Sequence, residues 1–259
     1  RAVRVPDIDR LDIEALDLAL AGLTGPHRGL AGGLPRGQVS EVVGPASSGR
    51  TGLVWAALAA ATRRGETVAL VDTFDRFDPP TAAACGIVLP RLLWVRGQAV
   101  SKTAVAIDPA WLPGVRAVNG PGTFVERVID RAIKSLNLVV QSRVCTLVVL
   151  DLIDVPAQAL RRLPAATWFR IERAIEGSDT AVVILAAQPV ARSSGGRSIA
   201  LGTNSHQEVP SRQVLWKGGH DRSRRLSGVR TRTSVGAARW SGTQSVDVVT
   251  RFTNVEAGL

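Results

Sequence analysis

Hydrophobic and polar residues along this chain follow two different periods, and each period predicts one kind of element. Strands are predicted where short, mostly apolar runs occur, at 38–43, 66–73, 92–95, 144–150 and 180–186. Helices are predicted where apolar residues recur at helical spacing, at 51–64, 78–86, 124–138 and 165–176. Strands that alternate with helices imply right-handed crossovers and a mostly parallel central sheet. The pattern therefore predicts an α/β fold.

Both ends of the chain and one internal segment depart from this alternation. Near the N-terminus, Ile8 to Leu20 has the spacing of an amphipathic helix, and 100–122 is poorly patterned and predicts a loop. A long polar loop is predicted from Gln188 to Ser211, and three segments beyond it alternate like antiparallel strands, at 213–216, 226–240 and 245–252. We therefore expect an N-terminal helix and linker over 1–28, and a core with antiparallel C-terminal strands over 29–259.

The positive charge is concentrated toward the C-terminus. From Pro189 onward there are eleven basic and four acidic residues, so this segment carries +7 of the formal net charge of +10. Such asymmetry favours a polyanionic partner, usually nucleic acid, although arginine-rich coding alone would give the same excess. The two cysteines, Cys85 and Cys145, have no zinc-site spacing and are interpreted as buried thiols. The most apolar stretch, 53–62, is too short to cross a bilayer, and we expect a cytoplasmic protein.

One glycine-containing loop carries the clearest chemistry. It lies between a predicted strand and a predicted helix and consists of Gly44, Pro45, Ala46, Ser47, Ser48, Gly49, Arg50 and Thr51. This matches the phosphate-binding loop G-x-x-x-x-G-K-[ST] except that Arg50 stands at the lysine position. Such a loop aims backbone N–H groups at phosphate oxygens, and Thr51 would supply a hydroxyl to Mg²⁺. Arginine keeps the charge but not the compact geometry of lysine, which favours weak nucleotide binding over catalysis.

The residues around this loop resemble RecA recombinases. The segment from Gly32 to Thr51, with its Gly-Leu-Pro-x-Gly and Gly-Pro-x-Ser-Ser-Gly phrases, is similar to that family, and the similarity continues through 65–72 and 77–86. The resemblance implies a Walker B aspartate at Asp151 that shares Mg²⁺ with Thr51, an adenine contact at Asp78 and a γ-phosphate sensor at Gln188. Asp151 could equally be a polar strand end, and Gln188 a plain loop residue. The resemblance also implies a DNA-binding loop after Gln188 that includes Arg192 and Arg197.

Three departures from the RecA pattern fall in one site. Besides Arg50, the position of the catalytic glutamate holds Phe74, which cannot orient a water, and Thr81 stands where an aromatic ring would stack on adenine. Asp75 is one residue along, and in a strand it would point to the opposite face. We therefore expect ATP and Mg²⁺ to bind weakly or not at all, and a protein that is not an ATPase.

Within the RecA-like proteins, the chain is most similar to the ImuA-type accessory subunit of the bacterial translesion-synthesis mutasome. The segments that carry this resemblance are 71–80, 84–87 and 91–97. It implies a non-catalytic role in DNA-damage-induced (SOS) translesion synthesis and mutagenesis. The implied partners are a Y-family-like protein, an error-prone replicative-type polymerase and RecA. The basic C-terminal half, with Arg222, Arg224 and Arg225, is expected to contact single-stranded DNA.

Two other functions are compatible with the sequence. The first is an active DNA-dependent ATPase or recombinase that uses Arg50 in place of lysine, and DNA-stimulated ATP turnover would identify it. The second is a binding protein that inhibits cell division, for which reversing the charges of Arg222, Arg224 and Arg225 would have no effect.

Overall fold

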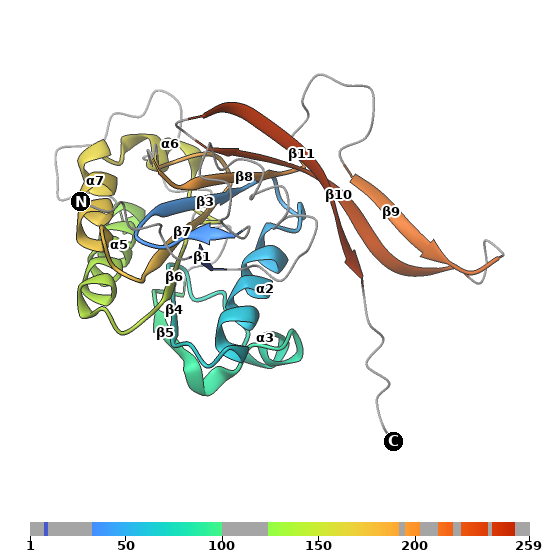
Figure 1. Cartoon of the computed structure of the whole chain (residues 1–259), viewed down its shortest axis with the longest axis horizontal. Helices are drawn as coiled ribbons and strands as arrows, with labels where there is room; N and C mark the ends of the chain where they lie inside the picture. Colours follow the sequence, from blue (N-terminus) through green and yellow to red (C-terminus); the bar gives the residue numbers. More distant parts are fainter. Residues whose placement is uncertain are drawn as a thin grey trace, which may run out of the picture.

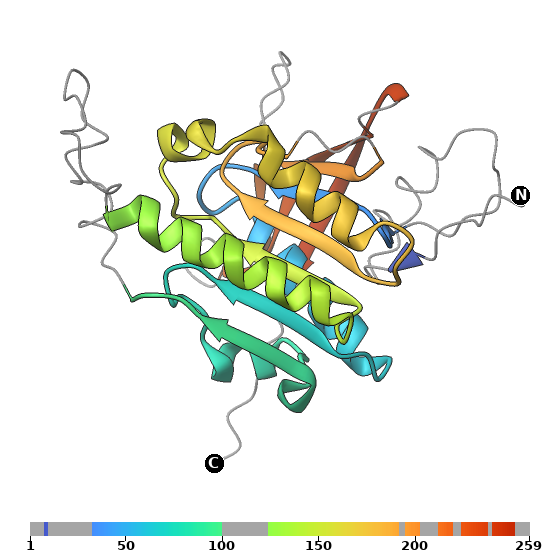
Figure 2. The same ribbon diagram turned by 90° about the vertical axis from the view of Figure 1, so that its left-hand side faces the viewer.

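The computed structural model describes residues 8–9, 33–99, 124–191, 195–202, 212–219, 224–237 and 240–251. These residues form a nine-stranded sheet with helices on both faces (Figures 1 and 2). The strand order is β11–β10–β8–β3–β7–β6–β4–β5, with β9 beside β10. The six strands from β8 to β5 are parallel to one another, whereas β9 and β11 pair antiparallel with β10, and β10 with β8. This confirms the predicted α/β fold with antiparallel C-terminal strands.

The parallel strands are short, and the four in the middle of the parallel part are almost wholly buried. Their bounds are Val39–Val43 (β3), Val68–Asp72 (β4), Leu92–Arg96 (β5), Leu147–Asp151 (β6), Ala181–Ala186 (β7) and Arg197–Leu201 (β8). All residues of β3, β4 and β7 are buried, as expected of strands that helices cover on both faces. The antiparallel strands are Arg212–Lys217 (β9), Arg225–Ala237 (β10) and Trp240–Arg251 (β11), and β9 with part of β10 extends away from the core (Figure 1).

The helices divide the core into two clusters, one on each face of the sheet. Helices α5 (Phe124–Ser142), α6 (Ala157–Arg162) and α7 (Ala165–Ile175) contribute to one cluster, and Figure 2 shows α5 and α7 in front of the sheet. Helices α2 (Arg50–Arg63) and α3 (Pro79–Ala84) contribute to the other. A 3₁₀ turn, η1 (Leu89–Arg91), precedes β5. None of the described helices is long and apolar enough to span a membrane.

Several predicted elements differ from the observed ones. The predicted loop from Gln188 to Ser211 contains strand β8, in which Ile199 and Leu201 are buried and alternate with more polar neighbours. Helix α6 was not predicted, and α5 continues to Ser142 because Val139 and Val140 extend its buried stripe. One run was predicted over 226–240, but β10 follows it only as far as Ala237, and Trp240 at its end begins β11.

The prediction for the N-terminus is wrong at its first two residues. Ile8 and Asp9 form strand β1 (Ile8–Asp9), which pairs antiparallel with β2 (Leu34–Pro35), instead of beginning a helix. The rest of the predicted helix and the predicted loop at 100–122 lie outside the described residues, and the division at residue 28 stays a prediction. Cys145 is buried as expected, whereas Cys85 is exposed.

Candidate functional site: the phosphate loop and its surroundings

The phosphate loop connects the end of β3 to the start of α2, as its sequence predicts. Gly44 begins the loop at a place where a side chain would not fit, because a Cβ there would lie 2.4 Å from the carbonyl oxygen of Leu201 at the end of β8. Arg212 of β9 donates to the carbonyl oxygen of Ser47 at 2.7 Å. The loop therefore packs against β8 and β9 as well as against the helix that it opens.

Arg50 turns its guanidinium back under the loop. Its Nη1 donates to the carbonyl oxygens of Gly44 and, at 3.4 Å, of Ala186, which lie at the ends of β3 and β7. Only 7% of Arg50 is exposed, and its Nε has no hydrogen-bond partner. Burial lowers the pKa of this guanidinium, while the nearby charges of Asp151 and Asp154 raise it. Its charge is therefore directed at backbone carbonyls of the core.

A narrow pocket of about 280 Å³ lies in front of the loop. The loop residues that line it are Ser47, Ser48, Gly49, Arg50 and Thr51, and the opposite wall consists of Ile153 with Val229 and Thr231 of β10. This volume is slightly below the ~300–1,000 Å³ of typical ligand sites. The loop and the helix N-terminus are placed to hold a phosphate-sized anion.

The predicted magnesium ligands do not come together in this pocket. Thr51 lines it, whereas Asp151 ends β6 outside it and accepts a hydrogen bond from the backbone N–H of Ile153 at 2.9 Å. No cluster of three or more His, Cys, Asp or Glu residues that could hold a metal is found within the described residues. Burial raises the pKa of Asp151 to about 7, and the charges of Asp72 and Asp154 act in the same direction.

Phe74 belongs to the hydrophobic core. It is 2% exposed and packs in the cluster that α5 and α7 share with the sheet. The carboxylate of the next residue, Asp75, binds Arg96 at 2.7 and 2.9 Å. Asp72 accepts from the backbone N–H groups of Arg76 and Phe77, both at 2.8 Å. Phe74 is therefore held by core packing, and the carboxylates of Asp72 and Asp75 are held by hydrogen bonds within the fold.

The remaining predicted nucleotide contacts lie apart from the loop. Asp78 is the N-cap of α3 and accepts from the backbone N–H of Thr81 at 3.0 Å and from its hydroxyl. These hydrogen bonds lower the pKa of Asp78. Gln188 donates to the carbonyl oxygen of Ala157 at 3.3 Å and lines a different pocket of about 420 Å³, beside α6 and α7. The structure therefore brings together the loop residues, but neither Asp78 nor Gln188 lines the pocket in front of the loop.

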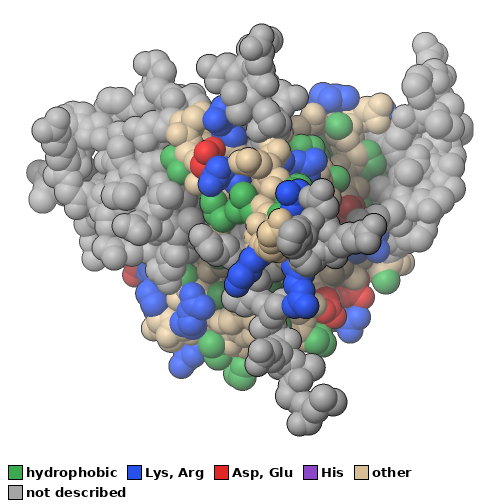
Figure 3. Space-filling view, turned by 90° about the vertical axis from the view of Figure 1, so that its right-hand side faces the viewer, with side chains coloured by type: hydrophobic (Ala, Val, Ile, Leu, Met, Phe, Trp, Pro, Cys, Tyr) green, Lys and Arg blue, Asp and Glu red, His purple; other side chains and the backbone are tan. Residues whose placement is uncertain are grey.

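The predicted DNA contacts differ in exposure. Arg224 and Arg225 are exposed at the start of β10, on a face where basic side chains are prominent (Figure 3). Arg197 lies in β8 instead of a loop, partly buried, with an Nε that has no hydrogen-bond partner and a pKa that burial lowers. Arg192 and Arg222 lie outside the described residues.

Sequence reasoning missed an apolar face on the segment formed by β9 and the start of β10. Trp216 is 56% exposed, and Val214 and Leu226 beside it are exposed as well. The register pairs Trp216 with Leu226 and Val214 with Val229, so these four side chains share one face. Val214 and Trp216, two positions apart in a strand that begins and ends with a basic residue, were the signal for this face.

Comparison with known proteins finds RecA-like sequences. Residues 5–108 match the RecA N-terminal domain. The chain is 44% identical to the RecA protein of Acidiphilium cryptum over 85 residues, and 38% and 40% identical to those of Trichodesmium erythraeum and Haemophilus ducreyi over 91 residues each. These alignments cover 32–35% of this chain and 24–25% of each relative, so the chain spans about a quarter of the length of the curated relatives it matches. The matches support a RecA-like family for this chain.

Proposed function

We propose that this chain is a non-catalytic RecA-like accessory protein in DNA-damage-induced translesion synthesis. The observation that carries the non-catalytic part is the position of Arg50, whose guanidinium is buried against the carbonyl oxygens of Gly44 and Ala186. Phosphoryl transfer needs a cation placed at the β- and γ-phosphates. A guanidinium held by the core would have to leave two acceptors unpaired before it could act there.

The buried position of Phe74 supports the same proposal. ATP hydrolysis requires a group that orients or deprotonates the attacking water. Phe74 is part of the core, and the neighbouring Asp75 is bound to Arg96. ATP and Mg²⁺ are accordingly proposed to bind weakly or not at all.

The proposed partners are the polymerases of a mutasome, RecA and single-stranded DNA. Support for the polymerases is the ImuA-type resemblance of residues 71–97, and support for DNA is the set of exposed arginines at the start of β10. Contacts of arginine with phosphates would be independent of sequence and weakened by salt. The proposed setting is the bacterial cytoplasm.

ATP turnover by the purified chain tests the non-catalytic proposal. Turnover is measured with Mg²⁺, with and without single-stranded DNA, beside Arg50→Ala as the contamination control and Arg50→Lys as a restored loop. We expect all three proteins to give the same background, because Arg50→Lys still lacks a general base. DNA-stimulated turnover that is lost in Arg50→Ala would overturn the proposal in favour of the recombinase-like enzyme.

The proposed pathway needs a separate test in the cell. Deleting the gene should lower the frequency of mutations induced by ultraviolet light without changing division in undamaged cells. A strain that expresses the Arg224→Glu/Arg225→Glu double variant shows whether these two arginines are needed for induced mutagenesis. Filamentation or altered division with unchanged induced mutagenesis would instead identify the cell-division alternative.

A further inference from the structure

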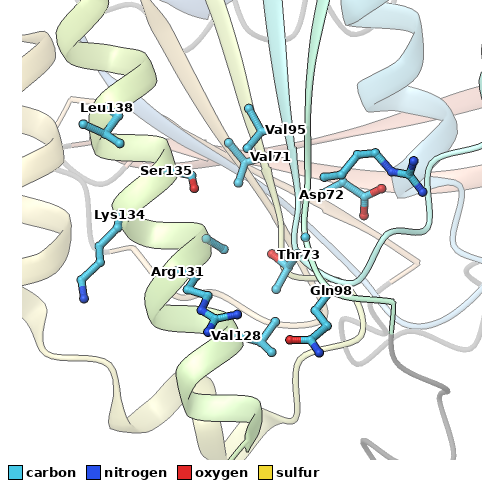
Figure 4. Close-up of a pocket in the computed structure, with 13 residues that line it drawn as sticks. Val71, Asp72, Thr73, Val95, Gln98, Val128, Arg131, Lys134, Ser135 and Leu138 are labelled. Atoms are coloured by element: carbon cyan, nitrogen blue, oxygen red, sulfur yellow. The ribbon is translucent and has the colours of Figure 1, made fainter.

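A groove of about 580 Å³ lies on the face of the sheet opposite to α2, between α5 and the edge of the sheet (Figure 4). Val71 of β4 and Val95 of β5 form its floor, and Val128, Ala132 and Leu138 of α5 form its wall. The volume falls within the ~300–1,000 Å³ of small-molecule sites. Gln188 and the phosphate loop do not line it, so the groove is separate from the site described above.

The groove exists because α5 packs on β6 and β4, whereas β5 lies at the edge of the sheet. The end of the groove is fixed by Gly97, whose N–H donates to the carbonyl oxygen of Asp72 at 2.8 Å. A Cβ on Gly97 would lie 2.2 Å from the carbonyl oxygen of Thr73, so only glycine allows this close approach. The chain after β5 is thereby held against the end of β4.

One end of the groove is polar, and its groups are not fully satisfied. Thr73 is 1% exposed, and its hydroxyl has no hydrogen-bond partner although it lines the groove. Figure 4 shows Thr73 and Gln98 on one side and the guanidinium of Arg131 on the other. A buried hydroxyl without a partner is destabilising, and a ligand oxygen at this position would supply the missing hydrogen bond.

Arg131 supplies the charge at this end. Two other cations that line the groove are paired, since Lys134 binds Asp130 at 2.7 Å and Arg96 binds Asp75. Among the described residues, no carboxylate pairs with Arg131. The lining therefore offers one free positive charge, two neutral hydrogen-bonding groups and an apolar surface, a combination complementary to a single negative charge on an apolar body.

We propose that this groove binds a small amphiphilic monoanion, such as a medium-chain carboxylate. The acid group would lie between Arg131, Gln98 and the hydroxyl of Thr73, and the apolar part would cover Val71, Val95 and the α5 wall. Leu138, which is 70% exposed at the other end of the groove, would lose its contact with water. This site is independent of the function proposed above.

Binding of octanoate to the whole chain, followed by calorimetry and by ligand-observed NMR, tests the proposal. We expect saturable binding at one site. Arg131→Gln should weaken it about tenfold, because a charge-assisted hydrogen bond is lost. Thr73→Val keeps the shape of the side chain and should weaken binding a few-fold, while the free protein becomes no less stable because no unpartnered hydroxyl remains buried.

Two controls distinguish this site from general attraction to a basic protein. Arg127→Gln removes a charge from an exposed position on the same helix that does not line the groove, and it should change affinity less than about twofold. Uncharged 1-octanol should bind wild type and Arg131→Gln equally. Absence of saturable octanoate binding, or affinities that are equal in wild type, Arg131→Gln and Thr73→Val, would overturn the proposal.

Discussion

Replacing Asp151 by asparagine is expected to remove much of the pH dependence of stability between pH 5 and 8. Asp151 ends β6 directly beside Asp72 of β4, and burial raises its pKa from 3.8 to about 7. A folded-state pKa above the unfolded value means that the folded chain holds a proton that the unfolded chain has released. The stability contributed by this proton is therefore lost as pH rises from about 4 to about 7.

The size of the effect follows from the pKa values. About three units between the folded and unfolded pKa correspond to ~4 kcal/mol at most, at 1.36 kcal/mol per unit. Asp151 is partly exposed and Arg50 offsets some of the charge, so we expect about half of this value, ~2 kcal/mol between pH 5 and 8. Asparagine keeps an oxygen that can accept from the N–H of Ile153, so the turn after β6 is preserved.

Urea unfolding followed by tryptophan fluorescence at pH 5, 6, 7 and 8 measures this difference. Wild type should lose stability relative to Asp151→Asn as pH rises, with most of the change between pH 5 and 7 and little beyond it. Asp130→Asn, which changes an exposed carboxylate on α5, serves as the control and should follow the wild-type curve. Parallel curves for wild type and Asp151→Asn would refute the reasoning, since they would mean that Asp151 titrates normally in the folded chain.

Three further predictions follow from single contacts. Gly97→Ala should destabilise the fold by more than ~2 kcal/mol in urea unfolding, because its Cβ would meet backbone atoms of Thr73 that cannot move alone, and a smaller loss would contradict this close packing. Phe74→Glu should lower the free energy of unfolding by ~3–5 kcal/mol and yield no ATP turnover, because it places a charge in the core. A stable variant with ATP turnover would instead place residue 74 at a catalytic site. Arg225→Glu should weaken the binding of single-stranded DNA. In titrations at several salt concentrations, it should also reduce the slope of log affinity against log salt by about one. An unchanged slope for Arg224→Glu would show that this neighbouring position makes no phosphate contact.

The strands of the parallel sheet could be predicted because their burial leaves a simple signal. Each is a short, nearly continuous apolar run, and the observed bounds differ from the predicted ones by at most three residues at either end. Strand β8 was missed because only Ile199 and Leu201 in it are fully buried. A short strand with only two buried residues between polar segments has the sequence pattern of a loop. It is recognised as a strand only when its pairing partners, β3 and β10, are known.

The loop of the candidate site could be predicted from the sequence, but its geometry could not. The phosphate loop follows from residue types and spacing alone, whereas the interpretation of position 74 as a lost glutamate rests on the resemblance to RecA and stays a prediction. The direction of the Arg50 side chain does not follow from residue types and spacing, because it depends on two carbonyl groups 6 and 136 residues away in the sequence. The narrow pocket in front of the loop depends on Val229 and Thr231, which sequence reasoning placed only in a strand of unknown position.

The hydrogen bonds of Arg50 give this residue a structural role beneath the phosphate loop. The ends of β3 and β7 present backbone carbonyls that point under the loop, and a buried carbonyl without a donor is costly. The long side chain of arginine brings one nitrogen, Nη1, to both Gly44 and Ala186, and the shorter side chain of lysine would place its ammonium farther from these carbonyls. We therefore expect Arg50→Lys to lower the stability of the fold by ~1–2 kcal/mol while leaving ATP turnover at background. An Arg50→Lys variant that is as stable as wild type would show that the arginine has no structural role. It would also remove the main support for the proposal that Arg50 stabilises the fold instead of binding phosphate.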